Sequence, residues 1–262
     1  MLISATEILK KYVPFGKPIQ YNEWTIYPVS IMDEYVWEEA CPLLDIDKNS
    51  LNNIDILRMS YLMFLTNLLV FDDEKQMFFN QLMRICLGLD DEVIIQLRIV
   101  DDDAEIVIGS GIQTKSGRII IDSPNAKIIN SKDFDEIKRI ILYQNLIGYT
   151  DEYIDPDVKA VVDEYYRLKN KNAPDVSLEQ KIAVIQAQTG MSNETINAMT
   201  LRGFYQLFNT IVSRVEYPIM KTAEYNGAKF NKPIEHWALR SPVDMYKEAF
   251  TGYGEFVDKI SV

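Results

Sequence analysis

The sequence predicts an α+β fold that is mostly α-helical, with a helical N-terminal part, a small central β-meander and a helical C-terminal part. Apolar residues recur at helical spacing up to residue 87 and again from residue 133 onward. Between these parts, residues 92–121 are rich in β-branched side chains and are interrupted by Asp, Gly and Ser, which is typical of short antiparallel strands. We therefore expect a helical region with a β-arm and the central β-meander over residues 1–130, and a helical region over residues 131–262.

The first elements are a short helix and an extended arm. Residues 4–12 have helical spacing, and Val13-Pro14 is expected to end the helix. Apolar and polar residues then alternate over residues 18–31, which predicts a pair of strands. The side chains expected to face inward from this pair are Ile19, Tyr21, Trp24, Ile26 and Val29.

Three helices are predicted before the meander. The first covers residues 33–44, and the second, over residues 51–71, has the strongest helical pattern. Acidic residues 72–74 suit the first turn of a third helix, which covers residues 75–87. The apolar stripes of the second and third helices consist of Ile54, Leu57, Tyr61, Phe64, Leu65 and Leu68, and of Met77, Phe78, Leu82 and Ile85, respectively.

The C-terminal helices are predicted mainly from their start signals. After a possible edge strand at residues 127–129, Asp133 with Glu136 has the spacing of a capping box. Pro156 fits the first turn of a helix that reaches about residue 170. Ser177 with Gln180 is a second capping box, Ser192 caps a short helix, and residues 201–226 carry a longer one.

Charge and apolar patterning exclude some classes of function. The 262 residues carry a net charge of −12, which disfavours nucleic acid as a partner because phosphate is also anionic. The longest apolar stretch, residues 59–71, is short of the roughly 20 residues that span a bilayer. The N-terminus does not have the pattern of a signal peptide. We expect a cytoplasmic protein in which Cys41 and Cys86 are buried free thiols.

No catalytic, cofactor-binding or metal-binding residue is predicted. The sequence has neither an HExxH nor a CxxC motif, and Gly109, Gly111 and Gly117 do not have the spacing of a nucleotide-binding loop. The run of aspartates at residues 101–103 is interpreted as a turn between two strands, with a hard-cation site as the alternative. The spacing of an EF-hand is absent, because Ile106 and Ile112 stand where Gly and Glu are needed.

The only histidine of the chain, His236, is followed by Trp237. Without a second His or a nucleophile motif, we interpret it as a packed side chain that fixes its segment to the C-terminal helices. A contact with a partner and a catalytic role are the alternatives.

Several phrases of the sequence, in their order, resemble one protein family. They are "ILRMSYLMFL" at residues 56–65, residues 131–159 after the meander, residues 177–208, and "NGAKFNKPIEHW" at residues 226–237. This order resembles proteins from the tail-gene clusters of phages and prophages of low-GC Gram-positive bacteria, which are usually described as tail assembly chaperones. The resemblance covers most of the chain but not residues 240–262.

The resemblance implies a role without catalysis. A tail assembly chaperone is expected to bind the long helical tape-measure protein, or another tail protein, and to keep it soluble until the tail assembles. Faces rich in Met and aromatic residues can recognise partner helices, although most of these residues fall on predicted core stripes. The alternatives are a structural subunit of the tail or baseplate and a small-molecule enzyme of unknown type.

Overall fold

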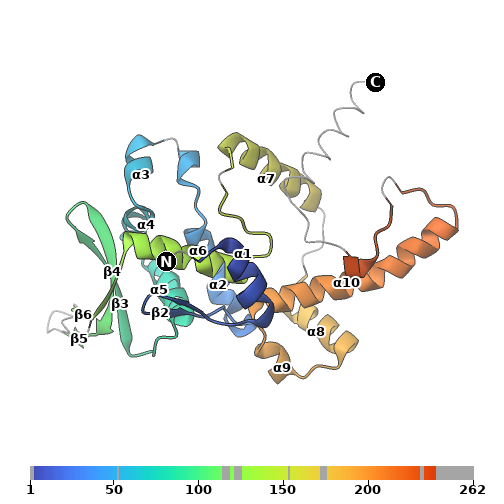
Figure 1. Ribbon diagram of the computed structural model, residues 1–262, viewed down its shortest axis with the longest axis horizontal. Coiled ribbons are helices and arrows are strands. Elements are labelled where there is room, and N and C mark those ends of the chain that lie inside the picture. Colours follow the sequence, from blue (N-terminus) through green and yellow to red (C-terminus); the bar gives the residue numbers. More distant parts are fainter. Residues whose placement is uncertain are drawn as a thin grey trace. The chain divides into compact units, whose positions relative to one another are not determined.

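The computed structural model describes residues 3–51, 53–113, 119–120, 126–152, 154–171, 176–230 and 233–239 (Figure 1). It confirms the predicted α+β fold, which is mostly helical and has small antiparallel sheets. The chain forms two compact units, Met1–Asn145 and Leu146–Val262. The division therefore follows Asn145 rather than residue 130, because the helix at residues 131–145 packs within the first unit.

The first unit begins with the predicted short helix and strand pair. The helix runs as α1 (Ala5–Glu7), a π-helical turn (Ile8–Tyr12) and a 3-10 turn (Val13–Phe15). Strands β1 (Ile19–Tyr21) and β2 (Trp24–Ile26) pair antiparallel. All five side chains that the sequence predicts to face inward are buried: Ile19, Tyr21, Trp24, Ile26 and Val29.

Helix α2 (Glu34–Leu44) follows as predicted, but the next predicted helix is divided. Residues 51–71 form α3 (Ile54–Arg58) and α4 (Tyr61–Leu69), separated by the extended backbone of Met59 and Ser60. Ser60 is the N-cap of α4, and its hydroxyl accepts a hydrogen bond from the N–H of Met63. The predicted continuous stripe is therefore wrong at three positions, because Ile54, Leu57 and Leu68 are exposed.

Helix α5 (Asp73–Leu87) starts with Asp72, whose carboxylate accepts a hydrogen bond from the N–H of Lys75. It ends at Gly88, which has a left-handed backbone with φ +59°. A Cβ atom at this position would lie 2.7 Å from a ring carbon of Tyr27, so both the backbone and the space favour glycine. Gly88 thus turns the chain from α5 toward the sheet.

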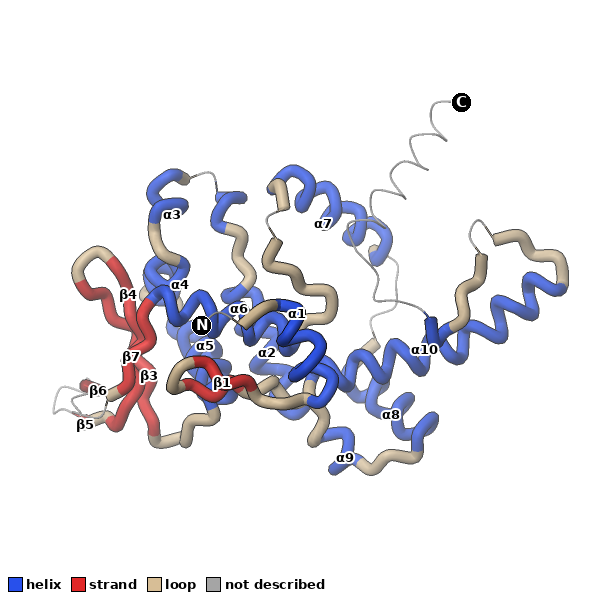
Figure 2. The backbone as a smooth tube through the Cα atoms, viewed as in Figure 1, coloured by secondary structure: helices blue, strands red, loops and turns tan. Residues whose placement is uncertain are grey.

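The predicted meander contains a three-stranded antiparallel sheet with the order β3-β4-β7 (Figure 2). Its strands are β3 (Val93–Val100), β4 (Asp103–Ser110) and the predicted edge strand β7 (Lys127–Asn130). Strands β5 (Ile112–Gln113) and β6 (Ile119–Ile120) form a separate pair. One face of the larger sheet, with Ile95, Ile106, Ile108 and Ile129, is buried where α4 and α6 (Ser131–Asn145) pack against the strands.

Helix α6 begins three residues earlier than the predicted capping box implies. Asn130 rather than Asp133 caps it, because the side-chain oxygen of Asn130 accepts a 2.9 Å hydrogen bond from the N–H of Asp133. The carboxylate of Asp133 in return accepts a 2.8 Å hydrogen bond from the side-chain Nδ2 of Asn130. Glu136, the other member of the predicted capping box, forms an ion pair with Arg139 instead.

Aromatic rings hold the core of the first unit together. Phe134, fully buried at the start of α6, has its ring centroid 6.4 Å from that of Tyr61 on α4 and 6.1 Å from that of Phe79 on α5. One side chain therefore joins three helices, and much of their packing depends on it.

The second unit is helical; two of its helices begin at the predicted caps, and a third begins at Pro156, as predicted. It contains α7 (Pro156–Asn170), α8 (Leu178–Thr189), α9 (Asn193–Asn197) and α10 (Leu201–Tyr225). The capping box of Ser177 and Gln180 forms at α8, and Ser192 caps α9. The first half of α10 packs against α8, and a short 3-10 turn (Trp237–Leu239) lies against α10.

The aromatic core of the first unit gives a stability prediction. Phe134→Ala should lower the free energy of unfolding by about 3–5 kcal/mol, since it leaves a cavity among three helices. Phe71→Ala is the matched control, because the Phe71 ring is 91% exposed and its loss should cost less than about 0.5 kcal/mol. Urea unfolding followed by circular dichroism measures both values. Equal losses for the two variants would contradict this description of the core.

Candidate functional site

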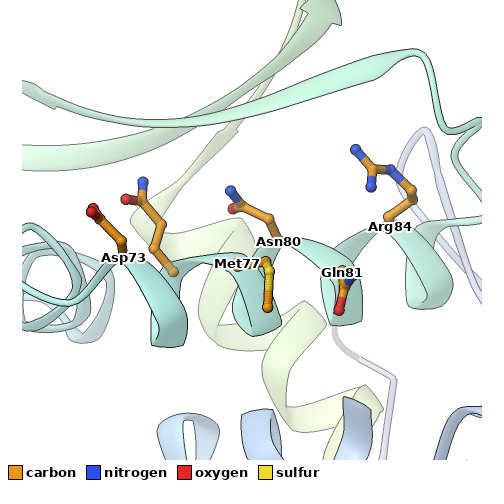
Figure 3. A pocket seen from close by; sticks show the side chains of 6 residues that line it. Asp73, Met77, Asn80, Gln81 and Arg84 are labelled. Atoms are coloured by element: carbon orange, nitrogen blue, oxygen red, sulfur yellow. The ribbon is translucent and has the colours of Figure 1, made fainter.

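A groove of about 370 Å³ runs along one side of α5 (Figure 3). Its lining side chains form two adjacent rows along the helix: a polar row at positions 73, 76, 80 and 84, and a second row at positions 77 and 81. All but one of them are polar or charged. The lining consists of Asp73, Gln76, Met77, Asn80, Gln81 and Arg84.

The opposite side of α5 explains why these rows face outward. Phe78, Phe79, Leu82, Met83 and Cys86 are buried in the first unit. The helix also packs against α2 and β2, and the ring of Tyr35 on α2 meets the edge of Phe78 at 5.5 Å. The prediction that Met77 belongs to the core is wrong, because it lines the groove and is 47% exposed.

Arg84 connects the groove to the sheet. Its Nη2 donates a 3.0 Å hydrogen bond to the carbonyl oxygen of Val93, the first residue of β3. Arg84 Nε and Asn80 Oδ1 are shielded from solvent and have no hydrogen-bond partner within the described part of the chain. Unpaired polar atoms of this kind are costly, so the groove contains groups that a water or an incoming chain can pair.

The aspartates at residues 101–103 form the predicted turn, and the third of them has a further role. Asp101 and Asp102 form the two-residue loop between β3 and β4. The Oδ1 atom of Asp103 accepts hydrogen bonds from Ser60 Oγ at 2.5 Å, from Ser131 Oγ at 2.6 Å and from the N–H of Ala104 at 2.8 Å. Because Ser60 and Ser131 stand at the starts of α4 and α6, the carboxylate joins the hairpin to two helices.

These bonds change the titration of Asp103. Partial burial acts to raise its pKa, but the hydrogen bonds from Ser131, Ser60 and the Ala104 amide outweigh burial and hold the pKa below its ordinary value. A carboxyl with a depressed pKa stabilises the fold above the pKa of the unfolded chain. That contribution is lost as the pH falls through the lower pKa of the folded state.

A second polar cluster lies on α6 and the residues around it. The Nζ atom of Lys138 lies 3.4 Å from the centroid of the Tyr61 ring, in the geometry of a cation–π contact. Burial lowers the pKa of Lys138 and raises the pKa of Asp135, and the attraction between their charges opposes both shifts. Burial also lowers the pKa of Lys48, whose ammonium donates hydrogen bonds to the carbonyls of Leu57 and Met59. These groups hold α6 and the residues before α4 together.

His236 lies against α10, as the sequence predicts. Its ring centroid is 4.9 Å from that of Tyr217 and 5.4 Å from that of Trp237. Its Nδ1 atom accepts a 3.2 Å hydrogen bond from the N–H of Ala238. The segment is only partly buried, since His236 is exposed and Trp237 is half-buried, so this contact is looser than a core.

The two cysteines are free and differ in burial. Cys86 is fully buried as predicted, whereas Cys41 is half-buried. Burial raises the pKa of Cys41 to about 12, with a smaller contribution from Asp45, and burial also raises the pKa of Cys86. Both thiols are therefore protonated at neutral pH.

Comparison of the chain with protein-family models, with curated proteins and with solved structures gives no significant match. Within the described ranges, no helix is long and apolar enough to cross a membrane. In the same ranges, no three His, Cys, Asp or Glu residues gather in an arrangement that could hold a metal ion.

The Asp103 contacts give a pH-dependent prediction. Asp103→Asn should lower the free energy of unfolding by about 1–2 kcal/mol near pH 7, the usual effect of weakening hydrogen bonds to a charged acceptor. The difference from the wild type should begin to shrink below about pH 4, where the carboxyl of the unfolded chain becomes protonated, and should shrink further as the pH falls through the lower pKa of the folded state. Asp102→Asn, in the same turn, should have little effect at either pH. Urea unfolding at pH 7 and pH 3 tests this, and a difference independent of pH would contradict the role of the carboxylate.

The raised pKa values predict slow thiol chemistry. At pH 8 a thiol with a pKa of 12 is about 10⁻⁴ ionised, compared with roughly a quarter for an ordinary cysteine of pKa ~8.5. Ellman's reagent should therefore react with native Cys41 on the order of 10³ times more slowly than with the unfolded chain, and Cys86 should not react before unfolding. Two thiols per chain should react in concentrated urea. A fast native phase would show that Cys41 is not shielded.

Proposed function

We propose that this chain is a phage protein without catalytic activity that acts in tail assembly, where it binds the tape-measure or another tail protein in the host cytoplasm and keeps it soluble. The observation that carries the proposal is a set of large apolar side chains exposed on helices. Single exposed apolar residues are common on protein surfaces, so their arrangement matters more than their number.

The clearest such arrangement is on the second half of α10. Val215 and Ile219 are 46% and 65% exposed and lie four residues apart, which places them on one face of the helix. The first half of the same helix buries Leu201, Phe204 and Ile211. An apolar stripe thus continues along α10 past the point where the described helices of its unit bury it, and it fits an amphipathic partner helix.

The charge of the chain supports the same function. Most of the net charge of −12 belongs to the first unit, where acidic residues cluster at positions 33–39, 72–74, 90–92 and 101–105. An acidic surface keeps a protein with exposed apolar side chains soluble. It also attracts basic segments of a partner from a distance and leaves apolar burial to supply the affinity.

The resemblance of residues 56–65, 131–159, 177–208 and 226–237 to tail assembly chaperones supplies the biological context of the proposal. The physical requirement for such a protein is a binding surface that holds a long helical chain without irreversible assembly. The exposed stripe of α10 in an acidic molecule meets that requirement.

Co-expression with the tape-measure protein of the same phage tests the proposal. The tape-measure protein should be soluble and pulled down only when this chain is present. The complex should survive 1 M salt, because apolar burial is not screened whereas exposed charge pairs are. Ile219→Asp should weaken binding roughly tenfold or more, since burying one Ile side chain contributes about 1.5–3 kcal/mol.

Asn209→Asp is the matched control, because it adds the same charge at an exposed polar position of the same helix and should leave binding intact. If the tape-measure protein sediments equally with and without this chain, it is not the client. If the chain is instead present stoichiometrically in purified particles, it is a structural subunit of the virion.

A further inference from the structure

The sheet of the first unit has a long open edge. In the order β3-β4-β7, the central strand β4 pairs on both sides, whereas β3 pairs with β4 alone among the described residues. Strand β3 is eight residues long, and Ile99 and Val100 at its end are exposed. A strand with one free side presents backbone N–H and C=O groups to any extended chain that reaches it.

The hairpin geometry shows which groups of β3 are free. Asp101 and Asp102 form a two-residue loop, so the flanking pair Val100 and Asp103 exchanges hydrogen bonds. Bonded and non-bonded pairs then alternate along an antiparallel ladder. The N–H and C=O groups of Ile95, Leu97 and Ile99 therefore point away from β4.

An independent contact agrees with this assignment. Val93 lies two residues before Ile95, so its backbone groups also point away from β4. Its carbonyl accepts the hydrogen bond from Arg84 on α5. The N–H of Val93 is bonded to the carbonyl of Asp90. Beyond Val93, no described group bonds to the outward N–H and C=O groups of Ile95, Leu97 or Ile99.

The groove of α5 adjoins this edge. Arg84 at one end of the groove reaches the first residue of β3. In Figure 3, Asp73, Asn80 and Arg84 point from α5 toward the side on which strands pass, whereas Met77 and Gln81 point elsewhere. The unpaired Asn80 Oδ1 and Arg84 Nε belong to this row. Through Arg84 the polar row of α5 therefore lies beside the first residue of β3, where the open edge begins.

Negative charge marks both ends of the open edge. Residues 90–92 (Asp, Asp and Glu) precede β3, and Asp101 and Asp102 follow it, and all five are exposed. Asp73 adds a carboxylate to the groove. A segment that lies along β3 would be stabilised by basic residues at its two ends.

We propose that the open edge of β3, beside the polar row of α5, binds an extended segment of a partner protein as a fourth strand of the sheet. The segment has a short apolar, β-prone centre and basic residues on both sides. Three outward-facing residues spaced by two require about five or six residues of partner in β conformation. The identification of that partner as a tail protein rests on the function proposed above, whereas the strand-binding site itself does not.

Synthetic peptides test the site directly. The probe is acetyl-KKVTVTVKK-amide, with two controls: acetyl-EEVTVTVEE-amide, which reverses the end charges, and acetyl-KKVTPTVKK-amide, in which proline removes a backbone donor. NMR titration of the full chain should show the basic peptide binding at least tenfold more tightly than either control. Amide exchange at Ile95, Leu97 and Ile99 should slow on binding. The amides of Ile94, Gln96 and Arg98, which already bond to β4, should change little.

Variants of β3 provide the second measurement. Ile99→Pro removes an outward N–H that takes no part in the ladder with β4, at an exposed position where proline is tolerated. It should weaken peptide binding at least tenfold while the inward amides remain protected. Ile99→Thr keeps the N–H and should bind within about twofold of the wild type. If the amides that bond to β4 exchange faster in Ile99→Pro, the substitution has disrupted the strand. Arg84→Met then replaces it as the test variant and should also weaken peptide binding.

Each outcome either supports or contradicts the proposed site. Slowed amide exchange at Ile95, Leu97 and Ile99, together with tighter binding of the basic peptide than of either control, supports it. No binding, equal binding of all three peptides, or binding without protection of Ile95, Leu97 and Ile99 overturns it. Slow exchange of these amides in the free chain also overturns the site, because it would mean that the edge is already covered. If that protection rises with protein concentration, a second copy covers the edge; if it does not, the chain's own residues cover it. If Ile99→Pro retains the tape-measure protein as well as the wild type does, that protein does not use the β3 edge, and the partner of the edge is another protein. If peptides bind at β3 but the tape-measure protein does not bind the wild-type chain, the proposed function fails and the site stands.

Discussion

The carboxylate of Asp103 is the contact on which the arrangement of the first unit depends. It receives hydrogen bonds from Ser60, the N-cap of α4, and from Ser131, the first residue of α6, at the point where the β3–β4 hairpin turns. A helix start has unpaired N–H groups and a partial positive charge, so a carboxylate placed beside two of them is favoured. The contact fixes the hairpin over α4 and α6, which buries one face of the sheet and leaves β3 at the edge.

Local signals in the sequence predicted the elements that depend on local chemistry. The caps Ser177 and Ser192 and the alternating arm at residues 18–31 are observed as predicted, because each uses contacts between near neighbours. The break at Met59 and Ser60 was missed, since apolar periodicity continues across it. Ser60 caps α4 through a local bond from the N–H of Met63, and its hydroxyl also bonds to Asp103, 43 positions away. The second contact cannot be predicted from a local pattern.

The candidate site was less predictable than the fold for the same reason. Strand β3 could be predicted from its β-branched residues, but its place at the edge follows from β7 pairing with the far side of β4. Met77 was assigned to the core because it continues the apolar pattern of α5. In the structure it lies next to the buried row that starts at Phe78, lines the groove and is 47% exposed. The acidic residues 72–74 were the local indication of where this helix begins, and the structure starts it at Asp73 rather than at residue 75.

An open edge strand is a hazard, because two copies can pair through it and aggregate. In an antiparallel pair of two β3 edges, residues 90–92 of one copy would meet Asp101 and Asp102 of the other. Like charges brought together in this way oppose the pairing. The same charges attract a segment with basic ends, so one set of residues discriminates against a second copy and in favour of a basic partner. An unpaired strand requires such an asymmetry if it is to avoid pairing with itself, and acidic residues at both ends of β3 provide it.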